Sequence, residues 1–253
     1  MISTTRNRKG KVRIWAIAAW MIIWQLASMG IGQEILLVSP VTVLQRLFAL
    51  IPTGEFWYII SFSFFRIMGG FLLAAVCGVI LAGIAVRFGV IEEFIRPFVF
   101  TIKSIPVASF VILVLIWIPS KNLSVIISFL MVFPIIYTNV LEGQKQMDEK
   151  LLEMADVFSL SRFVRIRYIY LSQILPYFRA GCSVALGLCW KAGVAAEVIG
   201  IPDYSIGEQL YQAKVYLNTP DLFAWTVVIV ILSVLFESVF LYVIDQIVHW
   251  VEK

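Results

Sequence analysis

The sequence predicts an all-α, polytopic membrane protein with about six transmembrane helices. Of its 253 residues, 61% are apolar and only 14% are charged, whereas roughly 25% of the residues of a soluble domain are charged. A soluble protein of this length could not bury so much apolar surface, so lipid must cover part of it. We therefore predict one transmembrane domain over residues 1–253. Its expected spans are residues 14–31, 59–86, 105–118, 123–140, 175–199 and 222–244.

The first span, residues 14–31, follows a basic leader at residues 6–13. No convincing small-residue cleavage site separates the two, so the span is not expected to be a removable signal. Between the first and second spans, Ser39 is suited to cap a helix and Pro40 to occupy its first position. We expect a helix to start there that is too short to cross the bilayer.

Two spans carry small residues at every fourth position, which places these residues on one helix face. In the second span they are Gly70, Ala74, Gly78 and Ala82, and in the fifth they are Gly181, Ala185, Cys189 and Gly193. Such a stripe allows a neighbouring helix to approach closely. For the second span the alternative is chance, because that run is rich in alanine and glycine.

Two prolines shape the middle of the chain. Pro106 removes a helix hydrogen bond and should bend the entry to the third span, which follows a short charged loop at residues 87–96. Pro134 lies inside the fourth span, where neighbouring helices can satisfy the carbonyl that it frees.

A polar segment, residues 142–167, separates the fourth span from the fifth. Asp148 is suited to cap one helix in this segment, and Ser161 is suited to cap a second. The residues expected to share one face of the first helix are Leu151, Ala155 and Phe158. We therefore predict two short helices joined by a tight bend.

The basic residues indicate how the chain is oriented. They concentrate in the leader, around Arg87 and in residues 145–167, and these regions alternate onto one side if there are six spans. Lys and Arg accumulate on the cytosolic side of membrane proteins. Both termini and the polar segment are therefore expected in the cytosol.

The sequence offers no candidate for catalysis, a metal or nucleic-acid binding. No Ser/His/Asp, Cys/His or carboxylate pair has a suitable spacing, and no ligand cluster indicates a metal site. Cys77, Cys182 and Cys189 lie in apolar runs as small packing residues. Membrane topology accounts for the basic residues. There is no G-x-x-x-x-G-K-S/T phosphate loop, so the chain cannot be its own ATPase.

The polar segment and the fifth span resemble the E-A-A…G…P signature of the membrane subunits of bacterial ABC importers. The residues that carry this resemblance are Glu153, Met154, Ala155, Ser159, Pro176 and Gly181. Other segments resemble the permease branch for sulfonates, taurine, nitrate and related solutes. They are Val38-Ser39-Pro40, Arg66 with Gly70-Phe71, Ser104-Ile105-Pro106, Phe133-Pro134 with Asn139 and Gly143, and Trp190 followed by Ala196-Glu197.

The sequence departs from the usual signature at three places. Met154 stands where the family usually has alanine, and Ser159 stands where it usually has glycine. Leu171-Ser172 replaces a usual Leu-Pro pair. Serine is more strained than glycine at positive φ, so these changes affect the detail of the bend between the short helices.

The resemblance implies a type I ABC importer permease with the MetI-like fold, in a bacterial cell membrane. Two copies would pair around one pathway, with two cytosolic ABC ATPase subunits and an extracytoplasmic binding protein that delivers a small, often anionic solute. The chain itself would hold no cofactor, because ATP and Mg²⁺ would be bound by the ATPase. The short helices would be coupling helices that fit a groove of the ATPase. The coupling residues would be Asp148, Leu151, Glu153, Met154, Ala155, Phe158, Ser159, Arg162 and Arg165.

Trp190, Lys191 and Glu197 are candidates for the pathway or a gate. Lys191 lies deep in an apolar span, where a charge costs about 2.5 kcal/mol or more. We expect Lys191 to line the pathway or pair with an acid, and to favour anions; the alternative is snorkelling to the outer surface. Glu197 is either structural or part of a gate. Trp190 either stacks on a solute or packs in the bundle.

Two other functions are open at this point. A self-contained membrane channel or intramembrane enzyme would work without an ATPase. An ABC exporter would keep the ATPase, but the lack of a fused ATPase domain and the extended outer loop, residues 202–221, favour import by analogy.

Overall fold

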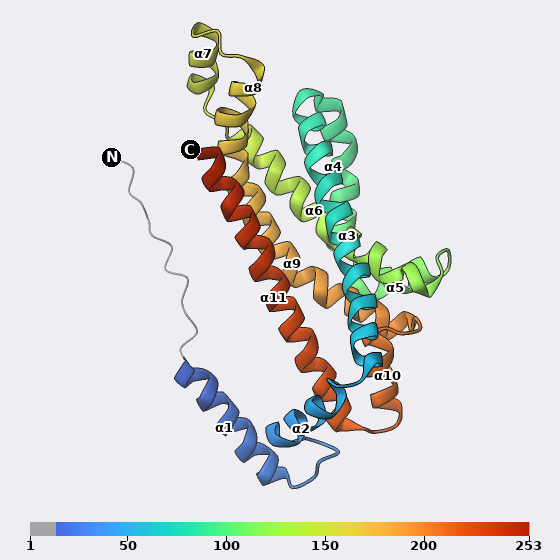
Figure 1. Cartoon of the computed structure of the whole chain (residues 1–253). Coiled ribbons are helices and arrows are strands. Elements are labelled where there is room, and N and C mark those ends of the chain that lie inside the picture. Colours follow the sequence, from blue (N-terminus) through green and yellow to red (C-terminus); the bar gives the residue numbers. More distant parts are fainter. Residues whose placement is uncertain (1–13, 253) are drawn as a thin grey trace.

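The computed structural model describes residues 14–252, and this part of the chain consists of helices joined by short turns (Figure 1). No strand occurs among these residues. The basic leader, residues 6–13, on which the expected orientation partly rests, lies outside them.

The helices follow one another in the order expected for a polytopic bundle. They are α1 Ile14–Ile31, α2 Pro40–Leu50, α3 Gly54–Arg87, α4 Gly89–Ser104, α5 Val107–Leu115, the 3-10 turn η1 Ser120–Asn122, α6 Leu123–Lys145, α7 Glu149–Val157, α8 Arg162–Arg165, the π-helical η2 Ile166–Leu171, α9 Ser172–Gly200, α10 Ile206–Val215 and α11 Thr219–Glu252.

Four helical segments in the described chain are long and apolar enough to cross a membrane. They are Gly54–Arg87, Ser120–Lys145, Arg162–Gly200 and Thr219–Trp250. The α4–α5 pair adds a fifth if its two helices count as one span, and the described part of α1, Trp15–Ile31, is shorter than the other candidates. The all-α membrane fold is confirmed, but the number of six spans is not.

The region around the expected third span differs from the sequence-based prediction. Residues 87–96, expected as a loop, lie mostly in α4, and residues 105–118 contain only the nine-residue α5. The two helices meet at an angle of 106°. The bend arises at Pro106, because a residue before proline avoids the helical region, and Ile105 accordingly has φ −84° and ψ 131°.

The short helix after the first apolar run forms as predicted. The Ser39 hydroxyl accepts a hydrogen bond from the Thr42 amide at 3.1 Å, and Pro40 occupies the first turn of α2. On the same helix, Arg46 donates two hydrogen bonds to the Asp221 carboxylate, which ties α2 to the start of α11.

The centre of the bundle is α6, which packs between α3 and α9 (Figure 1). A Cβ added to Gly70 of α3 would overlap the carbonyl oxygen of Val125 and lie 2.8 Å from the Cβ of Ser128 on α6. A Cβ added to Gly193 of α9 would lie 2.9 Å from the Ser128 hydroxyl. Glycine therefore allows both neighbouring helices to contact α6 at the same level.

The remaining small residues of the two stripes lie in the same helix contacts. A Cβ added to Gly78 would lie 3.0 Å from the Ile136 side chain, and one added to Gly181 would lie 3.1 Å from the Asn139 side chain. The stripe residues with no exposed surface are Ala74, Ala82, Ala185 and Cys189. The spacing of four residues thus corresponds to two continuous helix contacts along α6.

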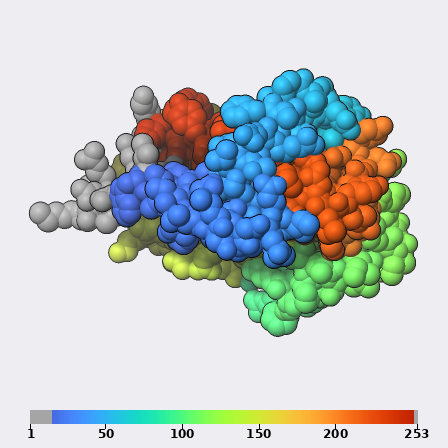
Figure 2. Space-filling model, turned by 90° about the horizontal axis from the view of Figure 1, so that it is seen from below, coloured from blue at the N-terminus to red at the C-terminus, as the bar shows by residue number. Residues whose placement is uncertain are grey.

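The two ends of the bundle carry different elements (Figure 1). One end, which we call the α7 end, holds α7, α8 and the last turns of α11. The opposite α10 end holds α2 and α10. Figure 2 views the α10 end and shows α10, in orange, between the first turns of α3 and the segment around α5 and η1.

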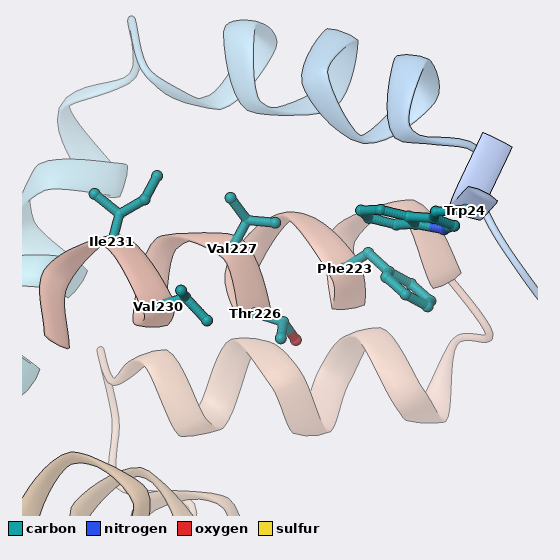
Figure 3. Close-up of a pocket in the computed structure, with 6 residues that line it drawn as sticks. All are labelled: Trp24, Phe223, Thr226, Val227, Val230 and Ile231. Carbon is teal, nitrogen blue, oxygen red and sulfur yellow. The ribbon is translucent and has the colours of Figure 1, made fainter. Parts of the chain in front are cut away.

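An apolar groove separates α1 from α11 (Figure 3). Its walls are Trp24, Phe223, Thr226, Val227, Val230 and Ile231. The Trp24 indole donates to the Val38 carbonyl at 3.0 Å, and its ring lies 5.7 Å from that of Phe223. Most other large side chains of α1 are exposed, as expected for a helix that faces lipid.

We expect Gly70→Ala to lower the melting temperature of the purified protein more than Gly69→Ala does. A Cβ at position 70 meets the backbone of α6, so α3 and α6 must move apart, and overpacking of this kind costs about 1–3 kcal/mol. A Cβ at position 69 has no heavy atom within 4 Å. Thermal unfolding in detergent measures both variants, and equal melting temperatures would contradict the proposed role of Gly70.

Candidate functional site

The polar segment between α6 and α9 folds into the two short helices that the sequence predicts. The Asp148 carboxylate accepts a hydrogen bond from the Lys150 amide at 3.0 Å, at the start of α7. The Ser161 hydroxyl accepts one from the Val164 amide at 3.4 Å, at the start of α8. Both predicted caps are confirmed, and each fixes the first turn of its helix.

Ser159 makes the bend between α7 and α8. Its φ of 50° lies in the left-handed region, where glycine is usual. The Leu160 amide donates to the Ala155 carbonyl, and the Ser159 amide donates to the Asp156 carbonyl, both at 3.0 Å. These two bonds form the Schellman motif that closes a helix C-terminus. The chain therefore adopts here the backbone conformation that glycine favours, although the residue is serine.

The α7–α8 segment presents apolar side chains away from the bundle. We call this surface the α7–α8 patch, and its residues are Met154, Val157, Phe158 and Phe163, with exposed fractions of 41%, 80%, 70% and 69%. Exposed charges flank it at Glu153 and Arg162. The Asp156 carboxylate lies 2.5 Å from the Arg165 guanidinium, which links the two helices across the bend.

One detail of the predicted coupling face is wrong, and two residues were missed. Ala155 is 0% exposed, because the chain turns back over it at Leu160, so it does not share the exposed face of Phe158. Val157 and Phe163 belong to the patch although the sequence analysis did not select them. Their signal in the sequence was their apolar character within an otherwise polar segment.

The α7–α8 segment is connected directly to the long helices. α8 continues through η2 into α9 as one helical run, Arg162–Gly200. The Arg167 guanidinium lies 4.0 Å from the centre of the Trp250 ring and donates to the Trp250 carbonyl at 3.1 Å. Further along, Arg179 of α9 donates two hydrogen bonds to Asp245 of α11. A displacement of α8 must therefore affect both α9 and α11.

Trp190 is placed in the core of the single chain. It is 1% exposed, and its ring centre lies 6.0 Å from that of Phe64 and 6.4 Å from that of Phe236. This position corresponds to the packing alternative rather than to a residue that stacks on solute.

Lys191 lies on a different face of α9, which points out of the bundle. It is exposed, and the apolar side chains of Val184 and Leu188 beside it are 57% and 44% exposed. Lys191 makes no hydrogen bond or ion pair with the described part of the chain. The structure thus places an unpaired cation in an apolar stripe about two thirds of the way along α9.

Glu197 is fully buried at a joint between three helices. Its carboxylate accepts hydrogen bonds from the Ser63 hydroxyl of α3 at 2.8 Å and from the Gly207 amide of α10 at 3.3 Å. Ser63 in turn accepts from the Ile206 amide at 2.9 Å. A Cβ on Gly207 would overlap the Glu197 side chain. Glu197 therefore holds the first turn of α10 against α3 and α9.

The described residues contain no group of three or more His, Cys, Asp or Glu that could hold a metal ion. Three other features stand out: the exposed apolar patch on α7–α8, the unpaired Lys191 on α9 and the Glu197 joint at the other end.

Comparison with known proteins identifies a family that fits these features. Residues 74–253, more than half of the chain, match the family described as binding-protein-dependent transport system inner membrane component. A permease protein of Bacillus subtilis (strain 168) named for aliphatic sulfonates transport is 28% identical over 240 residues, covering 92% of this chain and 85% of its own length. The taurine transport system permease protein of Escherichia coli (strain K12) is 26% identical, covering 91% of this chain and 86% of its own length.

A third relative is the nitrate import permease protein of Synechococcus elongatus, which is 26% identical and covers 77% of this chain and 73% of its own length. Each of these relatives is named as a transport permease rather than as an enzyme. The chain belongs to the family of binding-protein-dependent inner membrane components, and it is a permease subunit of an ABC importer.

Proposed function

We propose that two copies of this chain pair around one pathway for a small oxyanion, and that two ATPase subunits drive them by docking on the α7–α8 patch. The observation that carries the proposal is the patch itself. Its aromatic and aliphatic side chains are exposed at the tip of a segment that is otherwise polar. Exposed apolar clusters with a charged rim mark surfaces that another protein covers.

The construction of the patch supports a role in transmitting force. Asp148 and Ser161 cap its helices, and the ion pair of Asp156 with Arg165 spans the bend. A partner that grips the patch therefore moves a preformed unit. The Arg162–Gly200 run and the contact of Arg167 with Trp250 carry that movement into α9 and α11.

The charge distribution supports a cytosolic location for the α7 end. Lys145, Arg162, Arg165 and Arg167 all lie on or beside the α7–α8 segment. Basic residues at the ends of spans favour the cytosolic side. This orientation places the α10 end outside, facing an extracytoplasmic binding protein.

The positive charge of Lys191 supports the proposal that the solute is an anion. Relatives of this chain are named for transport of aliphatic sulfonates, nitrate and bicarbonate, all of which are oxyanions. A lysine without a partner in an apolar span is costly unless it faces a wet cavity or another chain. We place the face of α9 that holds Lys191, Val184 and Leu188 along the pathway between the two copies.

The docking proposal predicts that Phe158→Glu releases the ATPase. A carboxylate at this position would have to be buried against the partner without a counter-charge, so the complex should lose about tenfold or more in affinity. Co-purification of the co-expressed ATPase with the tagged permease measures the effect. Tyr216→Glu is the matched control, because Tyr216 is an aromatic residue that is 77% exposed at the α10 end. Full retention of the ATPase by Phe158→Glu would rule out docking on this patch.

The pathway proposal predicts that Lys191→Met slows ATP-driven uptake of an oxyanion solute by about tenfold without releasing the ATPase. The change removes the charge and keeps a long, flexible side chain. Uptake into proteoliposomes that contain the permease, the ATPase and the binding protein measures the rate. Arg87→Met at the end of α3 removes an exposed cation elsewhere and should transport normally. Unchanged rate and selectivity in Lys191→Met would remove Lys191 from the pathway.

A further inference from the structure

A second cationic site lies at the α10 end, apart from the features described above. A pocket of about 330 Å³ opens between α3, the turn that precedes α6 and the loop that precedes α10. The side chains that line it and carry the argument are Phe62, Arg66, Ser120, Lys121, Asp203 and Tyr204. They come from three separate segments of the chain.

Arg66 has a donor that the chain does not satisfy. Its guanidinium carbon lies 3.6 Å from the centre of the Phe62 ring, so the ring holds the guanidinium in place. Its Nη1 atom is buried and has no hydrogen-bond partner within the described residues. Arg66 also forms no ion pair there. A buried guanidinium donor without an acceptor in the chain is open to a water or to a ligand from outside it.

Two carboxylates act electrostatically on Arg66 without forming an ion pair with it. Glu197 accepts the hydrogen bonds from Ser63 and Gly207 through one oxygen, Oε2. Among the side chains that line the pocket, Arg66 and Lys121 carry two positive charges and Asp203 carries one negative charge. Glu197, which is not in the lining, is the second carboxylate that acts on Arg66.

The rest of the lining suits a small polar ligand. Ser120 and Tyr204 can each donate a hydroxyl hydrogen bond into the pocket. The Tyr204 ring packs edge-on against Tyr58 at 5.3 Å, and the Tyr204 amide donates to Glu208 at 2.7 Å. Tyr204 itself has a φ of 57°, so its backbone is held in a conformation that non-glycine residues rarely adopt.

We propose that this pocket binds a small oxyanion, with the guanidinium of Arg66 as its principal donor. A guanidinium presents paired N–H groups that match the spacing of sulfonate, nitrate or carboxylate oxygens, and Lys121 adds a flexible second charge. The volume is at the lower end of the range for small-molecule sites. In the orientation proposed above, the pocket is the first binding site that a solute meets after the binding protein releases it. That part of the inference rests on the proposed function. An acidic lipid headgroup offers the same chemistry.

The test uses Ser120→Cys in the complete permease–ATPase complex, held in phosphatidylcholine nanodiscs. The rate of thiol modification is measured with an anionic reagent, sulfonatoethyl methanethiosulfonate, and with its cationic trimethylammonioethyl counterpart. The parent chain gives the background, since Cys182 and Cys189 are buried and Cys77 is half-buried. The quantity compared is the anionic-to-cationic ratio of the two modification rates. We expect this ratio to be about tenfold higher at the introduced thiol than at a free thiol in solution. Tyr204→Cys provides a second reporter position if Ser120→Cys does not assemble.

Two charge variants of the reporter chain should move this ratio in opposite directions. Arg66→Gln should lower the anionic preference by about tenfold, and Asp203→Asn should raise it. Lys214→Gln, which removes an exposed cation outside the pocket lining, should leave it unchanged. If Arg66→Gln and Lys214→Gln lower the ratio equally, the preference comes from the overall surface charge rather than from the pocket. That result would overturn the proposal.

Competition then identifies the source of the oxyanion. Methanesulfonate or nitrate, compared with chloride at equal ionic strength, should slow modification in phosphatidylcholine. If thiol modification becomes slower only when phosphatidylglycerol is added to the nanodisc, the site binds a lipid headgroup. Absence of protection by either would overturn the site. None of these measurements needs transport, so loss of uptake and loss of this site are separate results.

Discussion

The close approach of α6 to α3 and α9 is the constraint on which the rest of the structure depends. In lipid, apolar side chains gain little by leaving the solvent, so helices associate through packing and hydrogen bonds. Gly70 and Gly193 bring two helices onto the same residue of α6, Ser128. The α7–α8 patch, the Lys191 face and the α10 joint are all attached to these three helices. Their relative positions therefore follow from contacts that tolerate no added methyl group.

Local rules explain which parts of the fold could be read from the sequence. The caps at Ser39, Asp148 and Ser161 depend only on a side chain and an amide two or three residues later, and all three form. The helix α4 was missed because charges such as Glu92 and Arg96 resembled a solvated loop. In the structure, Glu92 forms ion pairs with Arg96 and with Lys145 of α6. That contact depends on a partner more than fifty positions away in the chain, which no local pattern contains.

The candidate site shows the same division between local and long-range information. Trp190 and Lys191 are adjacent in the sequence, yet one is in the core and the other faces outward. Which of two neighbours faces in depends on where α3, α6 and α11 pack around α9. Likewise, the two charged residues near the α10 end differ by their partners. Glu197 accepts hydrogen bonds from two other elements at Oε2, whereas Arg66 forms no hydrogen bond within the described residues. One atom of each, Glu197 Oε1 and Arg66 Nη1, is buried without a partner there.

The uninterrupted run from Arg162 to Gly200 is a lever arm. The part beyond residue 171 is α9, whose 29 residues correspond to roughly 43 Å at about 1.5 Å per residue, so a tilt of about 10° at its start displaces Gly200 by roughly 8 Å. The π-helical turn at Ile166–Leu171 lies close to the short arm, where an irregular turn can act as a pivot. A small rotation at the α7 end would thereby become a larger displacement at the α10 end.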